Sequence, residues 1–489
     1  MRVSSAHAIM TGIAPDGGLF VPCEIPKLRT ADFPELAKMP YSVLAARILS
    51  MYLTDYSYDE LQDCADSAYS KEKFGSDSVA PVYKLNDTAY VLELWHGPTC
   101  AFKDMALQIL PHLLTRAVKK SGEKKDILIL VATSGDTGKA ALAGFSDVPG
   151  TKILVFYPKD GVSAIQKLQM TTQEGANVGV AAVRGNFDDA QTGVKQIFGN
   201  PDCAKEAAKA NCLFSSANSI NWGRLAPQIV YYIAAYADLF RNGEIASGEA
   251  VNIVVPTGNF GNILAAYYAK QMGLPVHKLI CASNQNNVLT DFINTGVYDK
   301  NRTFFTTISP SMDILISSNL ERFLFLASGR DDKLVRGLME QLKATGRYTV
   351  PQTIKQALNS TFYAGFATDQ ETKAAIANTF TSDAYLMDTH TAVAKFVYDR
   401  YVDETGDKTK TIIASTANPY KFNESVLTAI AGPEAALDAD EFALLDRLEK
   451  VSGQPIPAAL KDLKQKPARF DAAYEKDQLF FATKNFLTN

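Results

Sequence analysis

From residue 125 onward, short continuous apolar runs alternate with longer stretches in which apolar residues recur at helical spacing. A continuous run is typical of a strand buried on both faces, and helical spacing is typical of an amphipathic helix. These patterns predict strands at residues 127–132, 152–157, 178–183, 213–216, 251–255, 278–282 and 411–414. They predict helices at residues 139–145, 163–171, 187–198, 225–239 and 263–271. Because strands that alternate with helices form parallel βαβ units, we expect an α/β fold.

The remaining segments carry weaker patterns. Residues 42–53 and 61–69 have the spacing of amphipathic helices, and residues 12–22 are rich in turn-forming Gly, Pro and Asp. Residues 284–390 favour helices and loops, and the tail from residue 431 is charged and helical. The first 90 residues contain no catalytic cluster, so we expect them to pack against the rest or to form an oligomer contact.

These segments group into three predicted domains. Residues 1–90 form an N-terminal appendage, and residues 126–240 form a small α/β domain. Residues 91–125 and 241–489 together form a large α/β domain, so the architecture has two parallel-sheet layers.

Composition narrows the class of protein. The 489 residues are 47% hydrophobic and 21% charged, which is typical of a globular protein with a large core. The net charge of −4 gives no reason to expect nucleic acid or an anionic membrane surface as a partner. The six cysteines form no Cys-x-x-Cys pair, and the five histidines show no metal-ligand spacing, so no metal is predicted. The absence of a secretory signal and of a membrane-length apolar run favours a reduced cytoplasmic location.

Lys103 is the first candidate for chemistry. It lies within residues 94–108, where Thr99 predicts a helix N-terminus and Pro111 predicts a kink or a restart of the helix. The first turn of a helix disfavours a cation, so the pKa of Lys103 would fall and its neutral amine would suit Schiff-base chemistry. The alternative is an ordinary surface lysine paired with Asp104.

Two glycine loops join a predicted strand to a predicted helix. Residues 257–262 expose backbone amides at a helix start, which indicates an anion site, most naturally for phosphate. The alternative is a glycine turn that binds nothing. Residues 133–138 partly match a nucleotide-binding loop, but Thr133 replaces its first glycine and Ala140 replaces its magnesium-binding hydroxyl. This loop is better suited to a small carboxylate.

Polar residues follow two further strands. Residues 218–224 contain Ser219, Asn221 and Arg224, which are donors suited to a phosphate or carboxylate, although such a loop also caps helices. Ser415 and Thr416 end the last strand of the large domain, and ligand sites in parallel sheets gather at such ends. A reactive lysine combined with a phosphate loop indicates pyridoxal phosphate (PLP), an electron sink for carbanions.

The motifs together resemble the threonine synthase family, and specifically its longer-chain members. The resemblance covers most of the chain and rests on five motifs in the same order, with residues 12–22 similar to the family's N-terminal segment. The motifs are residues 96–104, 132–138, 218–224, 257–262 and 415–422. The resemblance implies a fold-type II PLP enzyme, similar to the tryptophan synthase β subunit, with PLP bound in the large domain.

The resemblance also implies roles for individual residues. Lys103 should be joined to the cofactor, next to Phe102. The cofactor phosphate should lie against Gly258, Asn259, Phe260, Gly261 and Asn262, and Thr416 rather than Ser415 should face the pyridine nitrogen. The substrate carboxylate should meet Thr133, Ser134 and Thr137, and the substrate phosphate should meet Ser219, Asn221, Arg224 and Asn259. Many relatives carry Asn at the position of Asp136, so its contact with the cofactor is left open.

The implied reaction converts O-phospho-L-homoserine and water to L-threonine and phosphate, by γ-elimination followed by β-addition of water. Two alternatives stay open. One is a PLP-dependent phospho-lyase that releases a 2-oxo acid from the same substrate, and the other is a catalytically silent homologue that acts as a binding protein. A monomer or a homodimer is expected, with no nucleic-acid or membrane partner.

Overall fold

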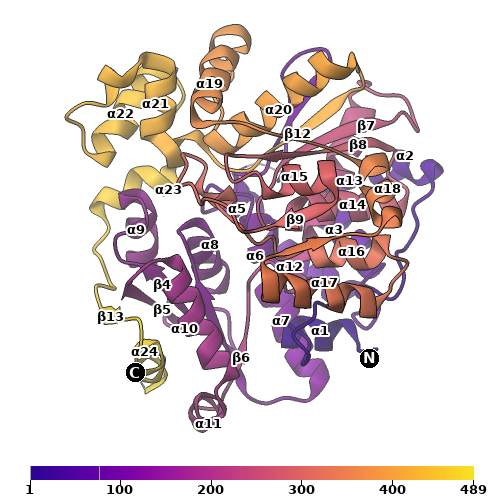
Figure 1. The fold of residues 1–489 in the computed structure, drawn as a ribbon. Coiled ribbons are helices and arrows are strands. Elements are labelled where there is room, and N and C mark those ends of the chain that lie inside the picture. The colour runs from indigo at the N-terminus through magenta and orange to yellow at the C-terminus, as the bar shows by residue number, and fades with distance from the viewer. Residues whose placement is uncertain (1, 76–77, 489) are drawn as a thin grey trace.

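The computed structural model describes residues 2–75 and 78–488, and its two large sheets are mainly parallel (Figure 1). The six-stranded sheet has the order β1 (Val82–Lys84), β2 (Ala89–Glu93), β12 (Thr411–Ser415), β7 (Val251–Pro256), β8 (Val276–Ser283) and β11 (Phe362–Phe366). Only β1 runs antiparallel to its neighbour in this sheet. The five-stranded sheet is all parallel, with the order β13 (Ala473–Glu475), β5 (Val178–Arg184), β4 (Thr151–Pro158), β3 (Asp126–Ala132) and β6 (Cys212–Ser215). A short antiparallel pair joins β9 (Val297–Asp299) to β10 (Arg347–Thr349).

Helices cover the faces of both sheets. The N-terminal helices are α1 (Ser5–Thr11), α2 (Phe33–Leu36), α3 (Tyr41–Ser50), α4 (Tyr58–Ala68) and α5 (Lys71–Phe74). Those up to the middle of the chain are α6 (Asp104–Leu107), α7 (Leu110–Ser121), α8 (Asp136–Phe145), α9 (Ala164–Thr171), α10 (Phe187–Gly199), α11 (Pro201–Lys209), α12 (Trp222–Leu225), α13 (Pro227–Arg241) and α14 (Gly261–Met272). The later helices are α15 (Val288–Thr295), α16 (Leu320–Ala327), α17 (Asp332–Thr345), α18 (Gln352–Thr361), α19 (Asp369–Asp383), α20 (Thr389–Thr405), α21 (Asn423–Ala431), α22 (Glu441–Ser452), α23 (Ala458–Lys461) and α24 (Leu479–Thr488).

The strands are buried on both faces, and alternate residues enter different cores. In β12, Ile412 joins a large central core, whereas Ile413 faces a second core that contains residues of α19–α22. In β3, Ile129 joins the same central core, whereas Leu130 faces a third core with α10 and α24. The central core therefore packs against one face of each sheet, and two-sided burial explains the unbroken apolar runs.

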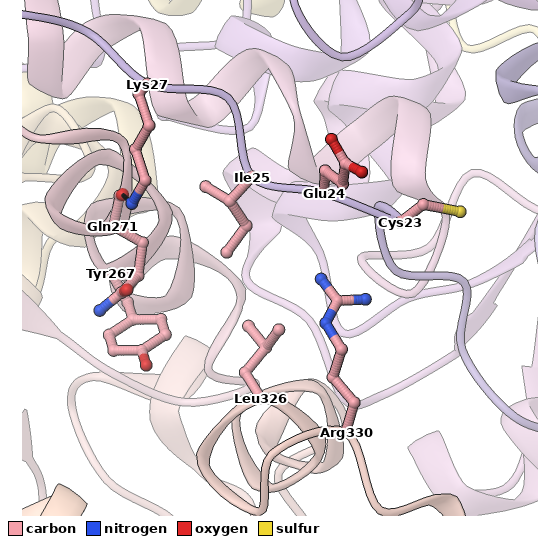
Figure 2. A pocket seen from close by; sticks show the side chains of 8 residues that line it. All are labelled: Cys23, Glu24, Ile25, Lys27, Tyr267, Gln271, Leu326 and Arg330. Atoms are coloured by element: carbon pink, nitrogen blue, oxygen red, sulfur yellow. Dashed lines mark hydrogen bonds between the residues drawn. The ribbon is translucent and has the colours of Figure 1, made fainter.

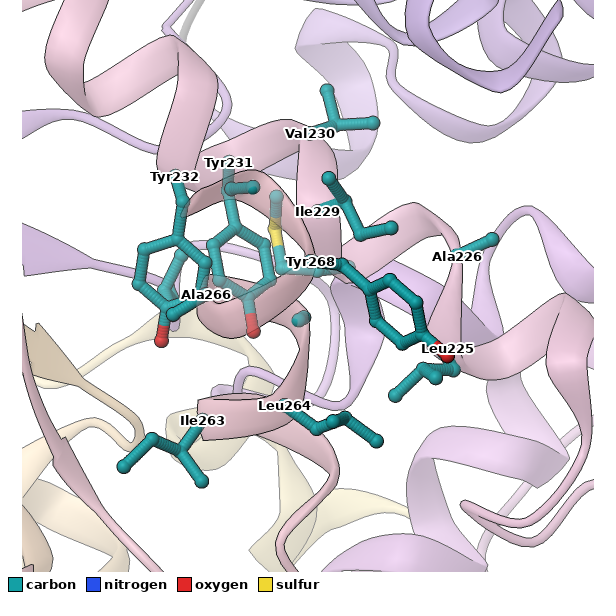
Figure 3. Close-up of a cluster of buried hydrophobic side chains, with 14 of the residues drawn as sticks. Leu225, Ala226, Ile229, Val230, Tyr231, Tyr232, Ile263, Leu264, Ala266 and Tyr268 are labelled. Atoms are coloured by element: carbon teal, nitrogen blue, oxygen red, sulfur yellow. The ribbon is translucent and has the colours of Figure 1, made fainter. Parts of the chain in front are cut away.

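Helices α13 and α14 fill much of the central core (Figure 3). Tyr231 and Tyr232 from α13 and Tyr268 from α14 all belong to this core, and all three side chains are fully buried. Residues of the N-terminal helices α3 and α4 belong to the same core, so the appendage packs against the rest of the chain.

The α/β fold and all seven predicted strands are confirmed. The five predicted helices are also present, although the segment predicted at 225–239 is divided into α12 and α13, with Pro227 at the start of α13. The sequence analysis missed β1, β2, β9, β10, β11 and β13. Several of these are short or lie at sheet edges, where burial on one side leaves a weak pattern.

The sheets cut across two of the predicted domain boundaries. The boundary at residue 90 falls within β2, which pairs with β12 of the six-stranded sheet. The tail was assigned to the large domain, but β13 pairs with β5, and α24 lies against α10 of the five-stranded sheet (Figure 1). The pairings of β2 with β12 and of β13 with β5 are observed in the structure, whereas the division into domains remains a prediction. None of the described helices is both long and apolar enough to span a membrane.

The helix predicted after Thr99 is interrupted, as Pro111 indicated. α6 ends at Leu107, and α7 starts at Leu110 with Pro111 in its first turn. α8 lies against α6 so closely that a Cβ atom on Gly144 would stand 2.0 Å from the backbone oxygen of Leu107. The absence of a side chain at Gly144 therefore fixes the spacing of the two helices.

We predict that Gly144→Ala lowers the free energy of unfolding by about 1–3 kcal/mol, because the added methyl group forces α8 away from α6. Urea unfolding of the full chain measures the change. Gly337→Ala in α17 is a matched control, since a Cβ atom there meets nothing within 4 Å and the same change is neutral or stabilising. Equal unfolding midpoints for the two variants would refute the close packing.

Candidate active site at the strand ends

The predicted site residues gather on loops that follow the carboxyl ends of strands from both sheets. Lys103 comes after β2, Asp136 after β3, Arg224 after β6, Gly258 after β7 and Thr416 after β12. This is the edge at which parallel sheets bind ligands. Side-chain contacts link several of these loops, and together the loops define a candidate site between the sheets.

Lys103 is buried at the centre of these loops. Its side chain is 10% exposed, and its Nζ atom lies 3.7 Å from Oδ2 of Asp136. Burial lowers the pKa of Lys103 to about 8, against the opposing effect of Asp136. The sequence analysis attributed the lowered pKa to the first turn of a helix. Lys103 instead precedes α6, which has only four residues and starts at Asp104. Removal from water, rather than a helix dipole, favours the neutral amine.

The predicted roles of Thr99 and Asp104 also change. Thr99 caps no helix, and instead its N–H and hydroxyl donate to the carboxylate of Asp104. That carboxylate is fully buried, and burial raises its pKa to about 6. The alternative of an exposed Lys103–Asp104 pair is therefore wrong, since neither side chain is at the surface.

Asp136 has two lysine neighbours. Its Oδ1 atom accepts from Nζ of Lys421 at 2.7 Å and from Nε2 of Gln166 at 3.1 Å, whereas Oδ2 faces Lys103. Burial alone would raise the pKa of Asp136, but Lys421 and Lys103 together hold it well below its usual range. The sequence analysis did not select Lys421, although it lies in the motif that follows β12.

The glycine loop after β7 has the features of an anion cradle. Among the residues that the structure describes, none accepts a hydrogen bond from the backbone N–H groups of residues 258–262. Phe260 adopts φ +60°, a left-handed conformation, immediately before α14. Free amides, a left-handed turn and a helix N-terminus together attract an anion. The arrangement fits the phosphate of PLP.

Asn262 adds a further free donor. Its Oδ1 atom accepts a hydrogen bond from the hydroxyl of Tyr232, while its Nδ2 atom is buried without a partner among the described residues. A buried amide nitrogen that lacks an acceptor is costly. Its position in the first turn of α14 fits a ligand oxygen as the missing acceptor.

Asn319, which the sequence analysis missed, connects this loop to the loop after β6. Its Nδ2 atom donates to the backbone oxygen of Asn259 at 3.0 Å and to the Ser219 hydroxyl at 3.2 Å. Arg322 in turn donates to Oδ1 of Asn319 and to the backbone oxygen of Ile220. Asn319, which directly precedes α16, and Arg322 on α16 therefore hold the two predicted binding loops side by side.

Arg224 supplies a buried positive charge. Its residue is 5% exposed, and its Nη1 atom donates to the backbone oxygen of Ala217 at 2.8 Å. Within residues 2–75 and 78–488, no carboxylate forms an ion pair with it, and burial lowers its pKa to about 10. A buried guanidinium without a counterion is suited to an anionic ligand.

The structure gives two predicted substrate contacts another role. Asn221 donates through Nδ2 to the backbone oxygens of Ile9 and Ser216 and accepts from the N–H of Gly223, so its amide is used within the protein. The hydroxyl of Thr133 accepts from two backbone amides of its own loop. Both are therefore loop-forming residues. Ser134 is exposed and Thr137 is half-buried, and neither hydroxyl bonds to another of the described residues.

The choice between Ser415 and Thr416 follows from their contacts. The Ser415 hydroxyl already accepts from Nε1 of Trp95 and from the hydroxyl of Thr391. The Thr416 hydroxyl bonds to no described side chain, and its backbone oxygen accepts from the N–H of Phe102. Thr416 is therefore the hydroxyl available to a ligand, and it lies next to the segment that carries Lys103.

An open hollow of about 500 Å³ lies elsewhere, between residues 23–27 and helices α14 and α16 (Figure 2). The guanidinium of Arg330 donates there to the backbone oxygen of Pro22, and the amine of Lys27 donates to that of Gln271. Arg330 and Lys27 are therefore bonded within the protein, and the described lining of this hollow includes no predicted site residue. Across the described residues, no three His, Cys, Asp or Glu side chains gather as metal ligands would.

Family models match nearly the whole chain. The model described as "Threonine synthase N terminus" matches residues 1–69, "Pyridoxal-phosphate dependent enzyme" matches residues 79–416, and "Threonine synthase, C-terminal" matches residues 391–479. The central match alone covers more than half of the chain. It includes every loop of the candidate site, although it ends at Thr416, within the loop after β12.

Individual relatives and a solved structure agree with these models. The chain is 42% identical over 435 residues to human "Threonine synthase-like 1", and the match covers 87% of this chain but 58% of that protein. It is 38% identical over 448 residues to threonine synthase of Pseudomonas aeruginosa, covering 91% and 92% of the two chains. The structure of PLP-bound threonine synthase from Brucella melitensis superposes with a TM-score of 0.86 at 35% identity, covering 99% and 96%. The chain therefore belongs to the threonine synthase family of PLP-dependent enzymes.

Proposed function

We propose that this protein is a threonine synthase, which converts O-phospho-L-homoserine and water to L-threonine and phosphate. The observation that carries the proposal is a pair of candidate anion sites, on two of the loops that gather with Lys103 at the strand ends. The free amides of residues 258–262 suit the cofactor phosphate, and the buried Arg224 suits a second phosphate on the substrate. A second anion site fits a substrate that carries a phosphate as well as a carboxylate, since the Ser134 and Thr137 hydroxyls are left for the carboxylate.

Each residue then has a task in the reaction. PLP, when bound, supplies an electron sink for the charge that develops at carbon. Lys103 is the base and acid that moves protons at Cα and Cβ of the substrate, because burial leaves its amine with a pKa near working pH. The Ser134 and Thr137 hydroxyls orient the substrate carboxylate. A neutral Thr416 hydroxyl near the pyridine nitrogen would leave that nitrogen less protonated than a carboxylate would.

Arg224 acts on the leaving group. Phosphate departs from Cγ with a full charge, and a guanidinium can make two charge-assisted hydrogen bonds to it. Ser219 and Asn259 complete this second anion site, because Asn319 bonds to the Ser219 hydroxyl and to the backbone oxygen of Asn259 and so holds the two loops together. The charge on the phosphate grows during departure, so these contacts stabilise the transition state more than the bound substrate.

The proposal is tested by incubating the PLP-loaded protein with O-phospho-L-homoserine and measuring threonine, 2-oxobutyrate and phosphate together. Threonine and phosphate in equal amounts are expected. Phosphate with 2-oxobutyrate would indicate a phospho-lyase instead. No product from a protein that binds PLP would indicate a binding protein.

We predict that Gly261→Val weakens PLP binding about ten- to a hundred-fold, because it disturbs amides that bond to a charged phosphate. The fold should survive, since a Cβ atom at residue 261 meets its nearest neighbour, Nδ2 of Asn319, at 3.4 Å. Gly258 is unsuitable for this test, because a Cβ atom there would lie 2.7 Å from the Ser311 backbone oxygen and would disturb the loop itself. PLP titration monitored by absorbance gives the affinity, with Gly337→Val as the matched control. Unchanged affinity would move the phosphate elsewhere.

We predict that Arg224→Ala retains PLP but lowers kcat/KM for O-phospho-L-homoserine about ten- to a hundred-fold, the loss expected for one charged hydrogen bond. A decrease in kcat as well as a rise in KM is expected, and Arg224→Lys should recover only part of the activity. Arg447→Ala is the control, since Arg447 also donates to backbone oxygens but lies on α22. Loss of PLP from Arg224→Ala would assign this residue to the cofactor.

A further inference from the structure

Lys421 is a fully buried cation near the candidate site. Its side chain is 0% exposed, and its ammonium donates to Oδ1 of Asp136 at 2.7 Å and to the backbone oxygen of Thr99 at 2.9 Å. Burying a lysine costs several kcal/mol unless it is well paired. A role limited to packing would be met by an apolar side chain of similar length, so the charge itself needs an explanation.

The geometry divides the carboxylate of Asp136 between two lysines. One oxygen faces Lys421 at hydrogen-bond distance, and the other faces Lys103 at the longer distance of 3.7 Å. Lys421 lies closer to this carboxylate than Lys103 does, and its positive charge repels Lys103 and so offsets part of the attraction from Asp136. Lys103 is thus held near an anion that another cation has already partly neutralised.

We propose that Lys421 is a positioning residue that fixes Asp136 as an anion and limits its pull on Lys103, so that Lys103 releases its proton and captures the cofactor aldehyde. This inference rests on the proposed role of Lys103 as the cofactor lysine. In the capture step the amine electron pair forms the bond to the aldehyde carbon. The aldehyde oxygen leaves as water, with the two hydrogens that the neutral amine carried, so a protonated amine cannot react.

The charges around Lys103 give the sign of the effect. Asp136 on α8 and Asp104 on α6 raise the pKa of Lys103, whereas Arg224 on α12 and Lys421, which follows β12, lower it. Replacing Lys421 by a neutral residue removes a repelling cation and leaves Lys103 as the closest cation to Asp136. The Lys103 amine then keeps its proton to a higher pH.

The rate of PLP capture as a function of pH tests this inference. Full-length protein freed of cofactor is mixed with PLP, reduced with borohydride at set times, and the pyridoxyl group on the Lys103 peptide is quantified by mass spectrometry. The wild-type rate should rise with a midpoint near pH 8, the pKa of Lys103. In Lys421→Met the midpoint should rise by roughly one to two pH units, because the variant removes a cation that repels Lys103 and neighbouring charges shift a pKa by about this much.

Two further variants make the result specific. Lys421→Arg keeps the charge and should restore the midpoint towards that of the wild type. Lys395→Met removes a largely buried lysine that pairs with Asp399 on α20, and its midpoint should stay unchanged. A Lys421→Met protein that loses stability in urea but keeps the wild-type midpoint would overturn the inference, because a purely structural lysine would behave in that way.

A second pair of variants tests the inference if Lys421→Met alone fails to fold. Asp136→Asn leaves Lys103 beside cations, so its midpoint should fall below that of the wild type. Adding Lys421→Met to Asp136→Asn removes the unpaired buried charge and should raise the midpoint again. Equal midpoints for these two variants would also overturn the inference. Absence of any label on Lys103 in the wild type would instead overturn the proposed function, so the two failures are distinguishable.

Discussion

One buried carboxylate, that of Asp136, connects the two sheets at the candidate site. It lies at the start of α8, directly after β3 of the five-stranded sheet, whereas its partners Lys103 and Lys421 follow β2 and β12 of the six-stranded sheet. Charges removed from water must be paired, and breaking such a pair typically costs about 3–5 kcal/mol. The same three side chains therefore connect the two sheets and influence the charge state of Lys103.

Packing reinforces this connection. The central core contacts one face of each sheet, and the contact between Gly144 and the backbone of Leu107 holds α8 against the helix that follows Lys103. Asn319 and Arg322 tie the loop after β6 to the loop after β7. These contacts restrain the two candidate anion sites, which the proposed reaction needs at a fixed separation.

The sequence predicted the strands that are buried on both faces, because two-sided burial leaves a continuous apolar run such as residues 127–132. It missed β2 and β11, whose pairing depends on segments distant in the chain, and it missed β13 at the edge of its sheet. Within the site, loops with unusual glycines were visible from sequence. Residues that act through one contact, such as Lys421 and Asn319, carry no local pattern. Asn221 and Thr133 were predicted to bind the substrate, but their side chains bond within the protein. Polar residues that stabilise a loop are of the same types as those that bind a ligand, so the sequence does not distinguish them.

The proposed function depends on two anion sites on the loops around Lys103, one for the cofactor phosphate and one for the substrate phosphate. A crystal structure of the full chain with PLP and an unreactive phosphonate analogue of O-phosphohomoserine would locate both phosphates at once. We expect the PLP phosphate on the backbone amides of residues 258–262, the phosphonate on Arg224, and a covalent link between PLP and either Lys103 or the analogue's amine. A PLP phosphate on Arg224, or a phosphonate distant from it, would show that the two sites are wrongly assigned.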